Sequence, residues 1–151
     1  MTRVTVIDDD QDVLDILHEL LESYGYEVDA RTAPVARIEE LIELRPDLLV
    51  IDLRLVTDRE ELSGLQTIHA ARTSPELREV PIVVCTADLI GLHEAWPALM
   101  ERGDVHQLTK PFDLRTFERV LAMATGSTPQ FSPLHALGTY GAEAGESERE
   151  A

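Results

Sequence analysis

Short apolar runs alternate with longer amphipathic segments through the first 124 residues of the chain. Continuous or β-branched apolar runs predict five short strands, at residues 4–7, 27–31, 48–51, 82–85 and 105–108. Between and after them, apolar residues recur at helical spacing in five segments, at residues 13–24, 35–44, 65–71, 88–102 and 113–124. The pattern therefore predicts a strand followed by a helix, five times over.

This alternation is typical of an α/β protein with a parallel sheet, because a helix must carry the chain back between successive parallel strands. Five such units predict a doubly wound five-stranded sheet in the flavodoxin-like order 2-1-3-4-5. The run Leu48–Ile51 is wholly apolar, which is expected of a central strand covered by helices on both faces.

Glycine, proline and aspartate mark several ends of the predicted helices. Gly25 ends the first helix, and Pro46 separates the second helix from the third strand. Pro97 falls within the fourth helical segment, so it either begins a second helical piece or kinks a longer helix. Asp113 stands in N-cap position before the last helix, whose inward-facing residues are expected to be Leu114, Phe117, Val120 and Leu121.

The acidic composition narrows the set of partners. The chain has 29 Asp and Glu against 13 Lys and Arg, giving a net charge of −16. DNA and anionic membranes are themselves negatively charged, so we expect no direct DNA binding and no membrane association. The single cysteine, Cys85, excludes an internal disulfide, and no apolar run approaches the length of a membrane span. A cytoplasmic location is the simplest expectation.

The chain divides by composition near residue 124. Residues 1–124 are expected to form one folded domain. Residues 125–151 are rich in Gly, Pro, Ser and Glu and predict a flexible C-terminal tail. We expect a stand-alone unit without a DNA-binding or catalytic output module.

Carboxylates follow two strands that should be neighbours in this sheet. Asp8, Asp9 and Asp10 come directly after the first strand, and Asp52 comes directly after the third. Ligands of this fold bind outside the carboxyl ends of the strands, where the strand order reverses, so these carboxylates should meet in one crevice. Helix capping explains an aspartate such as Asp10, but not Asp52. Clustered carboxylates suit a hard cation such as Mg²⁺ or Mn²⁺.

The fourth and fifth strands end in further polar groups. Thr86 and Ala87 close the fourth strand, and Thr109 and Lys110 close the fifth. Lys110 is the only lysine of the chain. A carboxylate, a divalent cation, an ammonium and a hydroxyl are the parts needed to move a phosphoryl group onto an aspartate.

At residues 3–124 the sequence resembles a response-regulator receiver domain, the CheY-like domain of two-component phosphorelay systems. The resemblance rests on four motifs in the right order, at residues 6–10, 46–52, 81–87 and 108–112. It implies that Asp52 is the phosphoacceptor and that Asp8, Asp9 and Asp52 hold Mg²⁺ with the backbone carbonyl of Arg54. It also implies that Thr86, Ala87 and Lys110 are the phosphoryl-binding and switch residues.

Several positions depart from the family pattern. The glycine usual eight residues after the acceptor comes twelve after it, as Gly64, so the loop at residues 57–62 holds an acidic insertion. Gln107 replaces the Tyr or Phe common three residues before the lysine, which puts the usual signalling route in doubt. Arg54 and Asp88 occupy positions that flank the phosphoryl in this family, and we expect them to modulate it, with Asp88 pairing with Arg54.

The leading hypothesis is a phosphorylation switch that receives its phosphoryl group from a sensor histidine kinase or phosphotransfer protein and signals to a protein partner. On this hypothesis we expect the chain to catalyse only its own phosphorylation and dephosphorylation and not to be an enzyme otherwise. One alternative is a constitutive interaction module that kept the site without the switch. A second is a phosphatase of the haloacid-dehalogenase type, because residues 8–12 carry paired aspartates. The sequence leaves open the downstream target and whether the chain forms a homodimer.

Overall fold

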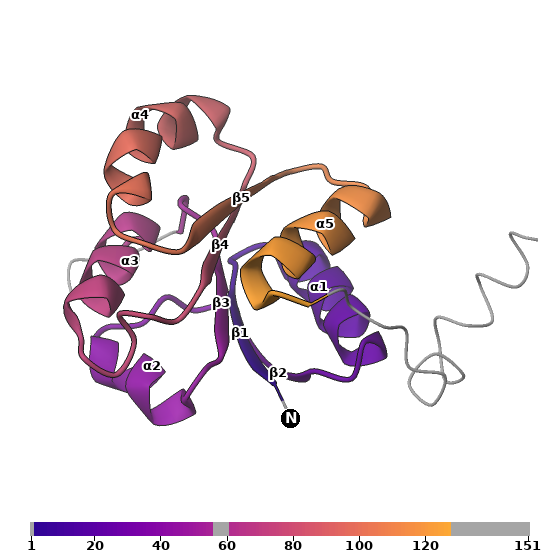
Figure 1. Ribbon diagram of the computed structural model, residues 1–151, viewed down its shortest axis with the longest axis horizontal. Helices are drawn as coiled ribbons and strands as arrows, with labels where there is room; N and C mark the ends of the chain where they lie inside the picture. The colour runs from indigo at the N-terminus through magenta and orange to yellow at the C-terminus, as the bar shows by residue number, and fades with distance from the viewer. Residues whose placement is uncertain (1, 56–60, 128–151) are drawn as a thin grey trace, which may run out of the picture.

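The computed structural model describes residues 2–55 and 61–127, which form a five-stranded parallel sheet with helices on both faces (Figure 1). The strands are β1 (Arg3–Ile7), β2 (Glu27–Arg31), β3 (Leu48–Ile51), β4 (Ile82–Thr86) and β5 (Val105–Thr109). The helices are α1 (Gln11–Ser23), α2 (Ile38–Leu44), α3 (Gly64–Thr73), α4 (Leu89–Met100) and α5 (Leu114–Thr125). The strand order is β2-β1-β3-β4-β5, which confirms the predicted doubly wound topology.

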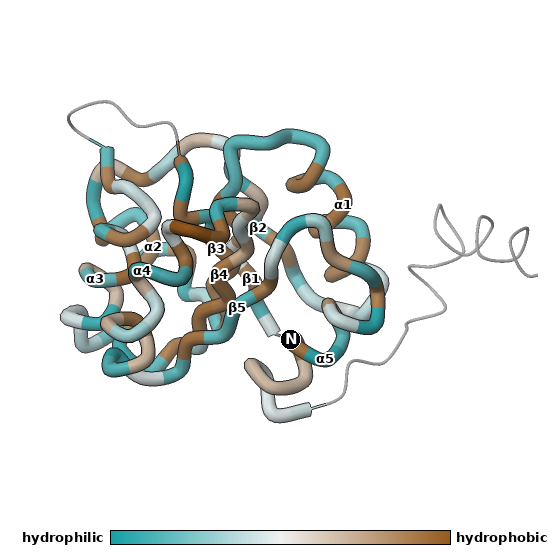
Figure 2. Tube along the Cα trace, turned by 90° about the horizontal axis from the view of Figure 1, so that it is seen from above, coloured by the Kyte–Doolittle hydropathy of each residue, from teal (hydrophilic) through white to brown (hydrophobic). Residues whose placement is uncertain are grey.

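The sheet separates two hydrophobic cores. Helices α1 and α5 cover one face, and α2, α3 and α4 cover the other (Figure 1). Successive side chains of a strand point to opposite faces, so Leu48 and Val50 pack toward α1 and α5 while Leu49 and Ile51 pack on the other side. Hydrophobic positions run along β3 and β4 in the middle of the molecule (Figure 2). This double burial explains why β3 reads as a continuous apolar run.

The helix ends are set by side-chain caps and by backbone conformation. Asp10 caps α1, and its carboxylate accepts from the backbone N–H groups of Asp12 and Val13. Asp113 caps α5 as predicted, and its carboxylate accepts from the N–H of Thr116. Gly25 follows α1 with a φ of +87°, a conformation that favours glycine.

Three local expectations need correction or resolution. Helix α2 begins at Ile38 rather than at residue 35. Val35 is apolar because it is a buried loop residue, 2% exposed, whose carbonyl accepts from the N–H of Leu62. Leu114 was expected to face inward, but it is 46% exposed in the first turn of α5. The fourth helical segment is a single helix with Pro97 inside it.

Residues 128–151, most of the predicted tail, lie outside the described residues, as does most of the predicted insertion. Helix α5 ends at Thr125, one residue past the predicted domain boundary. Within the described part of the chain, no helix is long and apolar enough to cross a membrane.

Candidate phosphoryl-acceptor site

Strand register brings Asp8 and Asp52 side by side. In the β1–β3 ladder Ile7 pairs with Ile51, so the residue after each strand emerges at the same edge of the sheet. The N–H of Asp52 donates to the carbonyl of Ile7 at 3.1 Å, which extends the ladder to the start of the loop. The parallel pairing predicted from sequence therefore positions both carboxylates.

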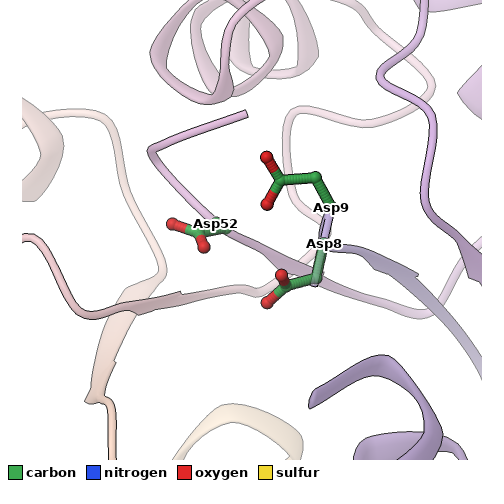
Figure 3. Close-up of side chains that lie close together, drawn as sticks. All are labelled: Asp8, Asp9 and Asp52. Carbon is green, nitrogen blue, oxygen red and sulfur yellow. The ribbon is translucent and has the colours of Figure 1, made fainter. Parts of the chain in front are cut away.

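Asp8, Asp9 and Asp52 form a carboxylate cluster at this edge (Figure 3). One carboxylate oxygen from each residue lies within 4.8 Å of the others. Asp8 is 1% exposed and Asp52 is 6% exposed, whereas Asp9 is exposed to solvent. The cluster is therefore open to solvent at Asp9 and buried at Asp8 and Asp52.

Burial raises the pKa of Asp8 above its ordinary value, because a carboxylate removed from water is disfavoured in its charged form. A hydrogen bond from the N–H of Asp10 and the neighbouring ammonium of Lys110 oppose this rise, and the charge of Asp52 adds to it. An additional positive charge beside Asp8 would therefore stabilise its charged form.

Lys110 supplies the positive charge within the site. Pairing of β5 with β4 positions Lys110 at this edge. Thr86 pairs with Thr109, and the N–H of Lys110 donates to the carbonyl of Thr86. The Lys110 Nζ lies 2.6 Å from Asp8 Oδ2 and 2.8 Å from Asp52 Oδ2. Burial lowers the pKa of Lys110, but its bonds to the two carboxylates outweigh burial and raise it. The ammonium stays charged between the two acids.

Both oxygens of Asp52 are engaged by donors. Oδ2 accepts from Lys110 Nζ, and Oδ1 accepts from the backbone N–H of Arg54 at 2.9 Å. The side chain of Lys110 and the backbone of Arg54 thus fix the orientation of the Asp52 carboxylate at the end of β3. The backbone of Arg54 thus adjoins Asp52, where the family resemblance places a carbonyl ligand.

Thr86 and Asp88 lie at the end of β4, beside this cluster. Thr86 is fully buried, and its Oγ1 accepts from the backbone N–H of Asp88 at 3.2 Å. Asp88 caps α4 through the N–H of Gly91 and pairs with the Arg54 guanidinium at 2.9 Å. The predicted pairing of Arg54 with Asp88 is therefore present in the structure. Ala87, between Thr86 and Asp88, is exposed.

Gly91 contributes to this arrangement and was not singled out from the sequence. A Cβ atom on Gly91 would collide with the Asp88 carboxylate where it now lies, so a larger residue would displace that capping side chain. The Asp-x-x-Gly spacing at a helix start was the available signal, since an N-cap side chain accepts from the N–H of the third helical residue. Gln107 is exposed on β5, at the position where the family usually has an aromatic residue.

The donor set fits a hard divalent cation. The three carboxylates offer only oxygen ligands, which Mg²⁺ and Mn²⁺ prefer, and one ammonium does not offset their combined charge. Asp10, by contrast, is used as a helix cap. The paired aspartates that suggested a haloacid-dehalogenase motif therefore have separate structural roles, since one is buried against Lys110 and the other caps α1.

A parallel sheet whose carboxyl edge carries this carboxylate cluster and a facing lysine defines the flavodoxin-like class of receiver domains. Comparison with known proteins gives the same family, because the model of the response regulator receiver domain matches residues 4–122. The chain belongs to the response regulator receiver domain family. This family is a signalling domain of two-component systems rather than a class of enzymes.

Individual relatives cover most of the chain. Protein Rrf1 of Nitratidesulfovibrio vulgaris is 31% identical over 131 residues, which are 84% of this chain and 88% of that protein. The DNA-binding dual master transcriptional regulator RpaA of Synechocystis is 28% identical over 133 residues, which are 86% of this chain. The match covers only 53% of RpaA, so the chain spans about half the length of that relative.

Among solved structures, the receiver domain of sensor histidine kinase PA1611 from Pseudomonas aeruginosa is similar, with a TM-score of 0.65 and 26% identity. The match covers 83% of this chain and 98% of that domain. That receiver domain holds a magnesium ion coordinated in its active-site cleft.

Proposed function

We propose that this chain accepts a phosphoryl group on Asp52 from a phosphohistidine of a sensor histidine kinase or phosphotransfer protein. The observation that carries the proposal is the environment of the Asp52 carboxylate. Its two oxygens are held by Lys110 and by the Arg54 N–H, and the carboxylates of Asp8 and Asp9 lie beside it. Such a group is a positioned nucleophile next to a place for a cation.

In the transfer, one oxygen of the Asp52 carboxylate forms a bond to phosphorus while the bond from phosphorus to the donor's imidazole nitrogen breaks. The imidazole keeps the electron pair of that bond and takes a proton from water. Hydrolysis later breaks the bond between the acyl oxygen and phosphorus and releases inorganic phosphate. Each step leaves Asp52 as a carboxylate or an acyl phosphate.

Asp8, Asp9 and Asp52, with the carbonyl of Arg54, would hold Mg²⁺. When bound, the cation supplies positive charge that offsets the charge on the transferred oxygens. The ammonium of Lys110 pairs with the same oxygens, and the hydroxyl of Thr86 turns toward them. Because Thr86 then leaves its contact with the N–H of Asp88, the loop between β4 and α4 adopts a second arrangement. A protein partner reads that arrangement.

The test is incubation with Mg²⁺ and acetyl phosphate, followed by intact-mass spectrometry. One added phosphoryl group is expected, and it should be absent in Asp52→Asn or when EDTA replaces Mg²⁺. Asp47→Asn is the matched control, because Asp47 lies at the opposite end of β3 and accepts from the N–H of Arg3. Uptake that persists in Asp52→Asn, or no uptake by the wild-type chain, would refute the proposal.

A constitutive interaction module is the second candidate, and the exposed Gln107 favours it. No aromatic side chain at this position is available to become buried when Thr86 moves. This candidate predicts that phosphorylation of Asp52 changes neither partner affinity nor elution volume. Size-exclusion chromatography of the chain before and after treatment with beryllofluoride separates the two candidates, since only the switch predicts a change.

A further inference from the structure

An ion pair joins the two loops that border the Asp52 carboxylate. Arg54, in the loop after β3, pairs through its Nε with Asp88 Oδ2, in the loop after β4, at 2.9 Å. The Arg54 side chain is 76% exposed and that of Asp88 is 22% exposed. Exposed ion pairs contribute little free energy, so this link is easily exchanged for a better one.

Asp88 connects this ion pair to the start of α4. Its Oδ1 accepts from the N–H of Gly91, and its carbonyl accepts from the N–H of Leu92. Its own N–H donates to Thr86 Oγ1, the hydroxyl placed to face a phosphoryl group. One residue therefore holds the first turn of α4, the buried threonine and the arginine of the neighbouring loop.

Arg54 is positioned to leave Asp88 for a stronger anion. Its backbone N–H already bonds Asp52 Oδ1, so its side chain starts two residues from the acceptor. A phosphoryl group on Asp52 would add negative charge and three further oxygen acceptors on this side of the site. Guanidinium groups bind phosphate oxygens in a bidentate manner, which favours phosphate over an exposed single contact to a carboxylate.

We propose that the Arg54–Asp88 ion pair is a latch on the first turn of α4 that opens when Asp52 carries a phosphoryl group. Arg54 exchanges Asp88 for the phosphoryl oxygens while Thr86 turns away from the Asp88 N–H. Asp88 then loses two of its partners together, and the cap on α4 loosens. This latch rests on the proposed phosphorylation of Asp52, and it offers a route for the signal that needs no aromatic residue at Gln107.

The surface that the latch controls is apolar. Leu89 and Ile90, the first two residues of α4, are 58% and 75% exposed. They follow the cap residue Asp88 directly in the chain, so their orientation follows the cap. Opening the latch changes how this pair of side chains is presented to a protein partner.

Amide hydrogen exchange of Gly91 and Leu92, followed by NMR, tests the latch. In the wild-type chain, exchange of both amides should become faster on phosphorylation with acetyl phosphate and Mg²⁺, by about two- to fivefold, the change that an exposed ion pair supports. In Arg54→Gln and in Asp88→Asn, exchange should already be faster before phosphorylation, and the further change should be smaller. Asp88→Asn is informative because asparagine still caps a helix but cannot pair with arginine.

Arg3→Gln is the matched control, because it breaks the exposed ion pair of Arg3 with Glu27 at the other end of the sheet. This variant should exchange as the wild type does in both states. If mass spectrometry shows no phosphoryl group on Asp52, the proposed function fails and the latch with it. If Asp52 is phosphorylated but both pair variants shift exchange equally in the two states, the ion pair is only structural and the latch alone is refuted.

Discussion

Gly64, the first residue of α3, lies directly against the backbone of the phosphoacceptor candidate Asp52. A Cβ atom on Gly64 would come 2.7 Å from the Cα of Leu53, and closer still to the carbonyl oxygen of Asp52. The neighbouring atoms belong to the backbone, so they cannot rotate away as a side chain would. The glycine therefore sets how closely α3 approaches the end of β3.

Gly64→Ala should both destabilise the chain and displace Asp52. Overpacking of this kind costs about 1–3 kcal/mol, because backbone must shift to make room. We expect a lower free energy of unfolding in urea and a slower uptake of phosphoryl groups from acetyl phosphate. Leu65→Ala, one residue further along α3 and 44% exposed in the wild type, serves as control and should leave phosphoryl uptake unchanged. A Gly64→Ala variant with wild-type stability would show that the loop yields freely.

The contact between Gly64 and Asp52 could not be predicted from the sequence. The sequence shows that Gly64 departs from the family spacing, but its contact with the backbone of Asp52 is a three-dimensional relationship that spacing does not give. The strands were predicted well because burial on two faces leaves a continuous apolar run, as in β3. The register that aligns Ile7 with Ile51 then follows from the topology, and with it the meeting of Asp8 and Asp52.

Errors arose where the burial of an apolar residue does not match what its spacing predicts. Val35 has the right spacing for α2 but is buried as part of a loop, whereas Leu114 has the right spacing in α5 and yet faces solvent. Apolar spacing alone cannot tell a helical turn from a buried loop, and it cannot show that the first turn of a helix extends beyond the core. The pairing of Arg54 with Asp88 was predicted from positions in a family, and composition or periodicity alone would not have given it.

Lys110→Met should destabilise the chain in the absence of divalent cations. The substitution leaves Asp8 and Asp52, 1% and 6% exposed, without their shared ammonium. Removing one partner of a buried ion pair typically costs about 3 kcal/mol, because a desolvated charge is left behind. Urea unfolding in EDTA measures this loss, and added Mg²⁺ should recover part of it. A variant equally stable in EDTA would mean that water already compensates the two carboxylates.

The stability that Asp113 provides should depend on pH. The hydrogen bond from the N–H of Thr116 lowers the pKa of the Asp113 carboxyl below its ordinary value of 3.8. A lowered folded-state pKa means that the stabilisation is present above the unfolded pKa and is lost as the pH falls through the folded pKa. Asp113→Asn keeps a capping side chain but removes this titration.

The urea midpoints of wild type and Asp113→Asn should therefore differ most near neutral pH and converge as the pH falls below 3.8. The variant Asp12→Asn removes an exposed carboxylate of α1 and controls for the change in net charge. A difference between wild type and Asp113→Asn that stays constant across this range would contradict the assignment of the cap.

Arg72 ties the loops at the opposite end of the sheet from the candidate site. Its guanidinium donates to the carbonyls of Arg78 and Val80, at 3.1 and 2.7 Å, and to that of Asp104 at 2.7 Å. The sequence does not predict this role, because the partners of Arg72 are backbone carbonyls, which every residue type has. Arg72→Met keeps an unbranched side chain but removes the donor to the Arg78 and Val80 carbonyls, while the carbonyl of Asp104 still accepts from the N–H of Ile82. The free energy of unfolding should fall by about 2 kcal/mol, since hydrogen bonds to a charged group are among the stronger ones.

Arg72→Lys should recover little of this loss, because one ammonium cannot reproduce the planar fork that reaches two loops at once. Arg78→Met, which changes an exposed arginine of the same loop, is the control and should have wild-type stability. Since Asp52 lies at the other end of the strands, Arg72→Met should still take up one phosphoryl group from acetyl phosphate while it remains folded. Loss of uptake at a temperature where the variant is fully folded would show that the two ends of the sheet are coupled through α3.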